Sequence, residues 1–158
     1  MTDASYQDGA ETPLHLVAQD ADDLQVISSL VQDAVLNATD MKYQAAKRRF
    51  ALLVNRFRWE DRAAAEVARR PYERVRSLLV IEDVLTVRSS GIDRTDPDLV
   101  LAVLSITFTP GMDGTGTLTL VLAGDGAVAL DVEALEVRLD DVTRPYRAPS
   151  GKRPDHAL

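Results

Sequence analysis

The alternation of apolar and polar residues predicts β-strands along most of the chain. Residues 48–59 (RRFALLVNRFRW) carry apolar side chains on both faces of a strand as far as Val54, after which one face turns to arginine. We therefore expect this strand to begin in the core and to emerge from it at Arg56. Residues 99–109 (LVLAVLSITFT) are almost wholly apolar, which indicates a strand at the centre of a sheet.

Short connections between strand-like segments predict antiparallel pairing. Residues 117–123 and 127–132 alternate apolar and polar side chains around Gly-Asp-Gly, which supplies the positive φ angles of a tight hairpin turn. Residues 35–39 and 41–45 are expected to pair as a second, shorter hairpin. Three further segments have the composition of strands, namely residues 14–18, 74–81 and 84–89.

One helix is predicted with clear limits at residues 21–34. Asp20 is a good N-cap residue, and the acidic residues of the first turn suit the helix dipole. Apolar residues recur at helical spacing as Leu24, Ile27, Leu30, Val31 and Ala34. Residues 60–71 predict a short surface helix or an ordered loop, with Val67 as its sizeable apolar anchor. Residues 132–142 fit a strand or a helix, and their good helix formers favour a second helix near the C-terminus.

These elements predict the α+β class, with a mostly antiparallel sheet that is barrel-like or sandwich-like. A chain of 158 residues suits one domain. We expect residues 13–146 to form this single domain, residues 1–12 to be disordered, and residues 147–158 to form a loose tail.

The composition narrows the classes of function. The chain has no cysteine, which excludes disulfides, thiolate zinc sites, iron–sulfur clusters and cysteine nucleophiles. It has no run of about 18 apolar residues, and its first residues lack the basic and apolar regions of a secretory signal. We therefore expect a cytoplasmic protein without a membrane partner.

The charge is distributed unevenly along the chain. The net charge is −7, yet residues 42–76 contain eleven basic and four acidic residues. Such a segment can bind nucleic acid or an acidic partner, or it can be neutralised by acidic segments of the same fold. Because the whole molecule is negative and repels phosphate backbones, the sequence favours internal neutralisation and disfavours nucleic acid as a partner.

Residues that could carry catalysis are scarce. His15 lies in an apolar strand, where a hydrogen-bonded structural imidazole is the simpler interpretation, and His156 is the third residue from the end. The acidic clusters at 20–23 and 140–141 could ligate a hard cation, but a capped helix start and a solvated end of an element explain them better. We predict no catalytic residue, no metal and no cofactor, and enzymatic activity is not favoured.

The segment NRFRWED, residues 55–61, is the strongest candidate for a site. Arg56 and Arg58 could bind a carboxylate or phosphate, Trp59 could form the floor, and Glu60 or Asp61 could act as a base. In the simpler interpretation the aromatic residues complete the core and the arginines pair with acids of the same chain. The sequence favours this structural interpretation over a binding site.

Four stretches of the sequence carry a resemblance to a known family. They are DLQVISSLVQDAV (23–35), RRFALLVNRFRWED (48–61), ERVRSLLVIEDVLTVRSSGID (73–93) and AGDGAVALDVEALEVRLDDV (123–142). Together they resemble an uncharacterised bacterial family, a domain of unknown function, in which RFALLVNRFRWED is the most specific motif. The resemblance covers residues 14–146 and implies no catalytic residues.

Three functions follow from these observations. The favoured one is a non-catalytic cytoplasmic protein that binds a protein partner or a second copy of itself. The alternative is a protein or enzyme that binds a small anion through Arg56, Arg58 and Trp59. The third is nucleic-acid binding through residues 42–76, which predicts salt-sensitive retention on DNA or RNA.

Overall fold

The computed structural model describes residues 12–148 and residue 154. The disordered segment predicted at 1–12 and the loose tail predicted at 147–158 therefore fall almost entirely outside the described residues. At the C-terminal side, the backbone N–H of Ala148 donates to the carbonyl of Tyr72 at 2.8 Å, and the side chain of Ala148 is buried.

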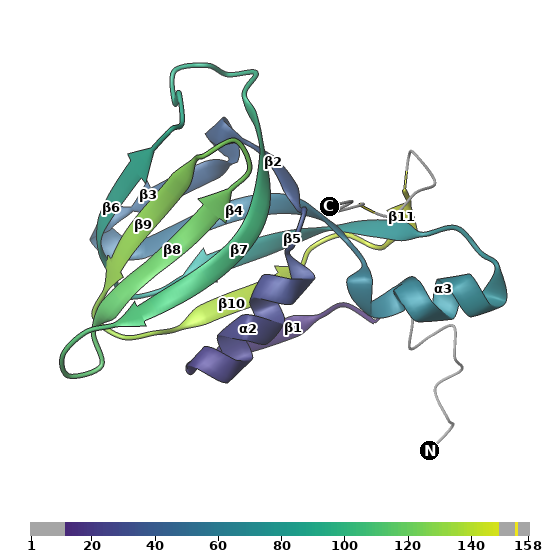
Figure 1. The fold of residues 1–158 in the computed structure, drawn as a ribbon, viewed down its shortest axis with the longest axis horizontal. Coiled ribbons are helices and arrows are strands. Elements are labelled where there is room, and N and C mark those ends of the chain that lie inside the picture. Colours follow the sequence, from purple (N-terminus) through teal and green to yellow (C-terminus); the bar gives the residue numbers. More distant parts are fainter. Residues whose placement is uncertain (1–11, 149–153, 155–158) are drawn as a thin grey trace.

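The chain forms one mostly antiparallel sheet with two α-helices, which confirms the predicted α+β class (Figure 1). The strands are β1 (His15–Ala18), β2 (Val35–Asn37), β3 (Met41–Gln44), β4 (Arg49–Phe57), β5 (Glu73–Ile81), β6 (Val84–Ser90), β7 (Val100–Pro110), β8 (Gly116–Leu122), β9 (Ala127–Val132), β10 (Val137–Asp141) and β11 (Tyr146–Arg147). The helices are α2 (Ala21–Leu30), α3 (Arg62–Ala68) and the 3₁₀ turns η1 (Ala38–Asp40), η2 (Ala45–Lys47) and η3 (Trp59–Asp61). None of the helices in the described ranges is long and apolar enough to cross a membrane.

The sheet bends over itself so that its two halves form the layers of a sandwich. The strand order is β1-β10-β5-β4-β2-β7-β8-β9-β6, with β3 added to β4 and β11 added to β5. In Figure 1 the strands β6, β9, β8 and β7 lie in front of β3, β4 and β5. The core fills the space between the two layers, where Leu52 and Leu79 of one layer and Leu118 and Leu130 of the other are fully buried.

The alternation in the C-terminal half is confirmed in detail. Leu118, Leu120 and Leu122 of β8 and the apolar residues of β9 point into the core. The turn between the two strands has Asp125 at φ 66° and Gly124 at φ 79°. The long apolar segment forms β7, which lies inside the sheet between β2 and β8.

The hairpin predicted for residues 35–45 is wrong. β2 and β3 do not pair with each other; they follow one another along the same edge of β4, with Val35 opposite Asn55 and Met41 opposite Leu52. The reason is that residues 38–40 form the turn η1, which moves the chain sideways without reversing its direction.

The first helix begins where predicted and ends earlier. The carboxylate of Asp20 caps α2 by accepting a hydrogen bond of 2.8 Å from the N–H of Asp23. The helix ends at Leu30 because Asp33 adopts a φ of 64° and its N–H donates to the carbonyl of Val103 in β7 at 2.8 Å. The helix packs against β1 and β7 and closes one side of the core.

The helix predicted for residues 132–142 is wrong. Residues 137–141 form β10, which pairs with β1 on one edge and β5 on the other. Val137 and Leu139 point into the core and Arg138 lies between them on the outer side, so the strand periodicity decides the structure and the helix propensity does not.

The second helix lies instead at residues 62–68, within the segment for which a short helix was expected. Its predicted anchor is wrong, because the side chain of Val67 is 87% exposed while Ala65 is fully buried. The residue of α3 that faces the protein is therefore a small one.

Candidate functional site

The NRFRWED segment occupies the end of β4 and the turn η3. Arg56 does not emerge from the core as predicted, because its side chain is fully buried on the face that also carries Val54. Phe57 is also fully buried, and the side chains of Arg58 and Asp61 are only 4% and 5% exposed. The segment therefore places two arginines inside the protein.

Arg56 is neutralised by carboxylates of the same chain. Its two terminal nitrogens donate to the two carboxylate oxygens of Glu60, each at 2.8 Å. One of them, Nη2, also donates to both oxygens of Asp141 at 3.0 Å, and Nε donates to the hydroxyl of Ser77 at 3.0 Å. The hydroxyl of Ser77 in turn donates to Asp141 at 2.6 Å.

Asp141 was predicted to sit at a solvated end of an element, and this is wrong. Its side chain is 4% exposed, and it also accepts a hydrogen bond of 2.9 Å from the N–H of Leu14. The residue therefore joins β10, β5 and β4 from inside the sheet. Sequence reasoning missed this role because the partner arginine lies 85 positions away.

The charges around Arg56 determine its pKa. Burial by itself lowers the pKa of Arg56, but the hydrogen bonds and charges of Glu60 and Asp141 outweigh burial and leave the pKa above its ordinary value. The raised pKa favours the charged guanidinium, and Glu60 and Asp141 pair with its positive charge inside the molecule.

Arg58 belongs to a second set of ion pairs beside the first. It donates to Glu73 of β5 at 2.6 Å and lies 3.6 Å from Asp61. Asp61 accepts two hydrogen bonds from Arg70, at 2.5 and 2.6 Å. These contacts fasten α3 to the ends of β4 and β5.

Trp59 contributes to the same structure. Its ring meets Phe57 edge-on with the ring centroids 4.7 Å apart, and its indole N–H donates to the carbonyl of Gln32 at 3.0 Å. It therefore joins the end of β4 to the turn that follows α2.

Part of the basic segment 42–76 is paired in the same way. Within the described part of the chain, five of its basic residues form ion pairs with carboxylates, namely Arg48, Arg49, Arg56, Arg58 and Arg70. The nucleic-acid interpretation of this segment stays a prediction.

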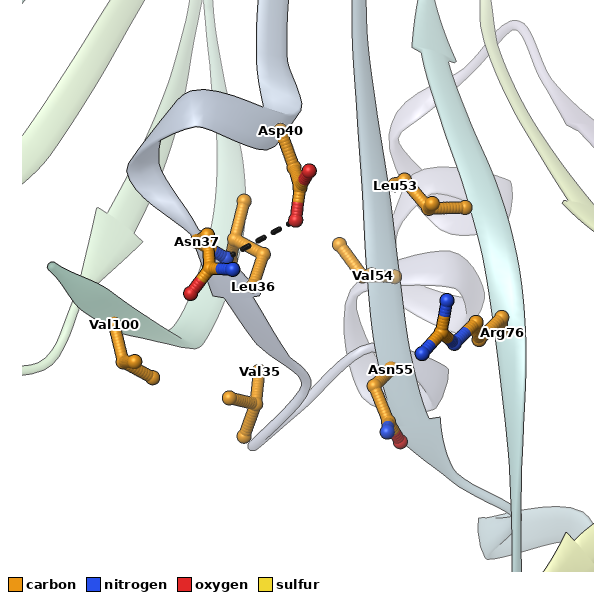
Figure 2. A pocket seen from close by; sticks show the side chains of 9 residues that line it. All are labelled: Val35, Leu36, Asn37, Asp40, Leu53, Val54, Asn55, Arg76 and Val100. Carbon is orange, nitrogen blue, oxygen red and sulfur yellow. Dashed lines mark hydrogen bonds between the residues drawn. The ribbon is translucent and has the colours of Figure 1, made fainter. Parts of the chain in front are cut away.

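A hollow of about 340 Å³ opens at the edge of β4, where η1 bends away from the strand (Figure 2). We call it the η1 hollow. Its lining consists of Val35, Leu36, Asn37, Asp40, Leu53, Val54, Asn55, Arg76 and Val100. A second hollow of about 220 Å³ lies between β3 and β6 and has mostly apolar walls. Neither is lined by Arg56, Arg58, Trp59, Glu60 or Asp61.

The outer side of the front layer is nearly free of charge, and we call it the neutral face. It consists of the outward-pointing residues Thr86, Arg88, Ser90, Ser105, Thr107, Thr109, Thr117, Thr119, Val121, Ala127, Ala129 and Asp131. Its two charges lie side by side, since Arg88 approaches Asp131 at 3.1 Å. Asp131 also accepts hydrogen bonds from the hydroxyls of Thr86 at 2.6 Å and Thr117 at 2.9 Å, and these lower its pKa.

The model of a family described as a protein of unknown function (DUF2948) matches residues 14–156. The chain belongs to the DUF2948 family. The predicted membership in a domain-of-unknown-function family is thereby confirmed. Neither the comparison with curated proteins nor that with solved structures gave a match.

The remaining candidates of the DUF2948 chain have structural partners. His15 lies on the edge strand β1, and its Nδ1 is 3.0 Å from a carboxylate oxygen of Asp140. The acidic residues at the start of α2 surround the cap formed by Asp20. Within the described ranges, no group of three or more histidine or acidic side chains is arranged to hold a metal ion.

Proposed function

We propose that the DUF2948 chain is a non-catalytic protein that binds a second copy of itself through the neutral face. The observation that carries the proposal is the shortage of charge on a wide, uncovered sheet surface. Charged side chains are depleted at the centres of protein interfaces, yet they make up 27% of this chain. In Figure 1 neither helix covers the outer side of β8 and β9.

The opposite layer of the same sheet provides a comparison. The outer side of β1, β10 and β5 carries the polar residues His15, Arg76, Arg138 and Asp140 beside the apolar residues Val17, Leu78 and Val80. The neutral face has the same backbone architecture but threonine, serine and alanine in the corresponding places. Strand structure alone therefore does not account for its composition.

The chemistry of the neutral face suits a second copy. A hydroxyl group both donates and accepts hydrogen bonds, so a surface of threonine and serine is complementary to itself. Each copy has a net charge of −7, but the ion pair of Arg88 and Asp131 leaves this face without net charge, so the contact region adds no repulsion between two copies.

The area of the face sets the expected affinity. Four strands spaced about 4.8 Å apart and six residues of about 3.4 Å each give roughly 400 Å² per copy. The total of roughly 800 Å² for two copies is about a third below ~1,200 Å², the lower end of the range for standard interfaces. We therefore expect a weak dimer with a dissociation constant on the order of 10 μM.

Sedimentation equilibrium between about 1 and 200 μM tests this proposal. Thr119 lies in the central row of the face, and Thr119→Glu should weaken the dimer at least about tenfold because it places an unpaired charge in the middle of the interface. Ala51→Glu is the matched control, since it adds the same charge to the middle of β4 in the other layer. A protein that is monomeric at every concentration, or a Thr119→Glu variant that dimerises like Ala51→Glu, would contradict the proposal.

We further propose a bacterial, cytoplasmic setting for this association. The absence of cysteine supports it, because a cysteine-free chain gains nothing from an oxidising compartment. The resemblance of the sequence to a bacterial family supports the source.

A further inference from the structure

We propose that the η1 hollow binds a free α-amino acid with an apolar side chain. The hollow exists because β2, η1 and β3 follow one edge of β4 without staying in register. Leu53 and Val54 have partners in β5 but none in β2 or β3, since the turn η1 bends outward beside them. A stretch of β4 is thereby accessible from its edge.

The backbone of Leu53 faces this opening. The N–H of Arg76 donates to the hydroxyl of Thr143, and its carbonyl accepts from the N–H of Val142, so both groups point away from β4. Asn55, which lies opposite Arg76, accordingly directs its backbone toward β2. The edge toward which the backbone N–H and C=O groups point alternates from one residue to the next along an antiparallel strand. Leu53, two residues from Asn55, therefore presents its N–H and C=O to the hollow.

Side chains of opposite charge lie on two sides of the hollow. Figure 2 shows Asp40 on η1 and Arg76 on β5, with β4 between them. Among the described residues, the guanidinium of Arg76 makes no hydrogen bond or ion pair, unlike the buried Arg56. The carboxylate of Asp40 accepts one hydrogen bond, at 3.3 Å from the N–H of Asn37, and has further acceptor capacity.

This arrangement selects the chemical class of the ligand. A guanidinium binds a carboxylate through two parallel hydrogen bonds, and a carboxylate such as Asp40 pairs with an ammonium group. The lining also contains apolar side chains, of which Val35 and Val100 are exposed at the lower rim in Figure 2. A ligand with a carboxylate, an ammonium group and an aliphatic side chain satisfies all three features.

The volume agrees with a ligand of this size. About 340 Å³ corresponds to roughly eleven water molecules at ~30 Å³ each. A leucine molecule and a few waters fill that space. An open site of this kind at a surface is expected to bind in the millimolar range.

Titration of the full chain with L-leucine, followed by amide chemical shifts, tests the proposal. We expect shifts at Leu53 and Asn55 that saturate below about 10 mM. Arg76→Gln and Asp40→Asn should each weaken binding at least about tenfold, because each removes one charge-assisted contact. Arg69→Gln, which removes an exposed arginine at the end of α3, should bind like the wild type.

Two related compounds separate this site from a simple anion site. Leucine amide lacks the carboxylate and 4-methylpentanoate lacks the ammonium group, so both should bind at least about tenfold more weakly than leucine. Absence of saturable shifts at Leu53, equal binding of 4-methylpentanoate, or unchanged binding by Arg76→Gln would overturn the proposal. Leucine binding can be measured independently of the proposed dimer, because Thr119→Glu leaves the η1 hollow intact.

Discussion

Replacement of Arg56 by methionine should destabilise the protein severely. The substitution keeps an apolar stem in the core but leaves the carboxylate of Asp141 buried, with Ser77 and the N–H of Leu14 as its remaining donors. Glu60 is about a quarter exposed and can turn to water. The penalty therefore comes chiefly from Asp141, and breaking a buried pair in this way costs about 3–5 kcal/mol.

Substitution of two other arginines gives a scale for this loss of stability. Arg58→Met should cost less, about 1–2 kcal/mol, because Asp61 retains its two hydrogen bonds from Arg70 and Glu73 is 28% exposed. Arg48→Met removes a pair in which both side chains are more than half exposed, so its cost should stay below about 1 kcal/mol. The order of the three effects follows from what each substitution leaves unpaired.

Urea unfolding measures these differences. The sole tryptophan, Trp59, packs on Phe57 and reports on the region directly by fluorescence, with circular dichroism as an independent probe. Proteins of this size lose about 2–4 °C in Tm per kcal/mol, so Arg56→Met should lower Tm by roughly 10 °C. The free energy of unfolding of the Arg56→Met variant is expected to remain positive only if that of the wild type exceeds about 5 kcal/mol.

A double variant tests the cause of the loss. Asp141→Asn alone should destabilise the protein, because it weakens the pairing with Arg56. In the Arg56→Met background the same substitution should restore stability, since it removes the uncompensated buried charge. If Asp141→Asn destabilises both backgrounds equally, or if Arg56→Met costs no more than Arg48→Met, the electrostatic reasoning is refuted.

Three further predictions concern local contacts. Thr86→Val should raise the pKa of Asp131 in an NMR titration, and a pKa that does not move would refute the role of the hydroxyl. Because the pKa of Asp131 is depressed in the folded protein, its stabilising effect is present above the unfolded pKa of about 3.9. This effect is lost as pH falls through the folded pKa. Ser28→Ala should cost about 1–3 kcal/mol in urea unfolding, since its hydroxyl accepts a hydrogen bond of 2.9 Å from a buried amide of β7, and a loss under 0.5 kcal/mol would contradict this. Ala65→Leu should lower the free energy of unfolding by about 1–3 kcal/mol through overpacking, whereas Val67→Leu should change it by less than about 0.5 kcal/mol. Equal effects of the two substitutions would contradict the orientation of α3, in which Ala65 is buried and Val67 is exposed.

The parts of the fold that were predicted correctly are those that local patterns determine. The hairpin of β8 and β9 follows from strict alternation around a turn with two residues at positive φ, and the start of α2 follows from the cap at Asp20. Each of these signals lies within one continuous stretch of the sequence, so no knowledge of a distant partner is required.

The parts that were predicted wrongly depend on distant strands. The helix α2 ends at Leu30 because β7 takes the N–H of Asp33. Residues 137–141 become β10 because β1 and β5 supply hydrogen bonds on both edges. The η1 hollow was not predicted for the same reason, since it arises from the way the segment 35–44 lies along β4.

The two wrong predictions, that Arg56 emerges from the core and that Asp141 is solvated, have one physical cause. A lone arginine after an apolar run indicates the surface, and a lone pair of aspartates at the end of a segment indicates the same. Each residue is buried because the other is present, and Ser77 joins them across β5. The positive charge in NRFRWED is therefore already paired within the chain, and the ligand that we propose contacts Arg76, on the outer face of the neighbouring strand β5.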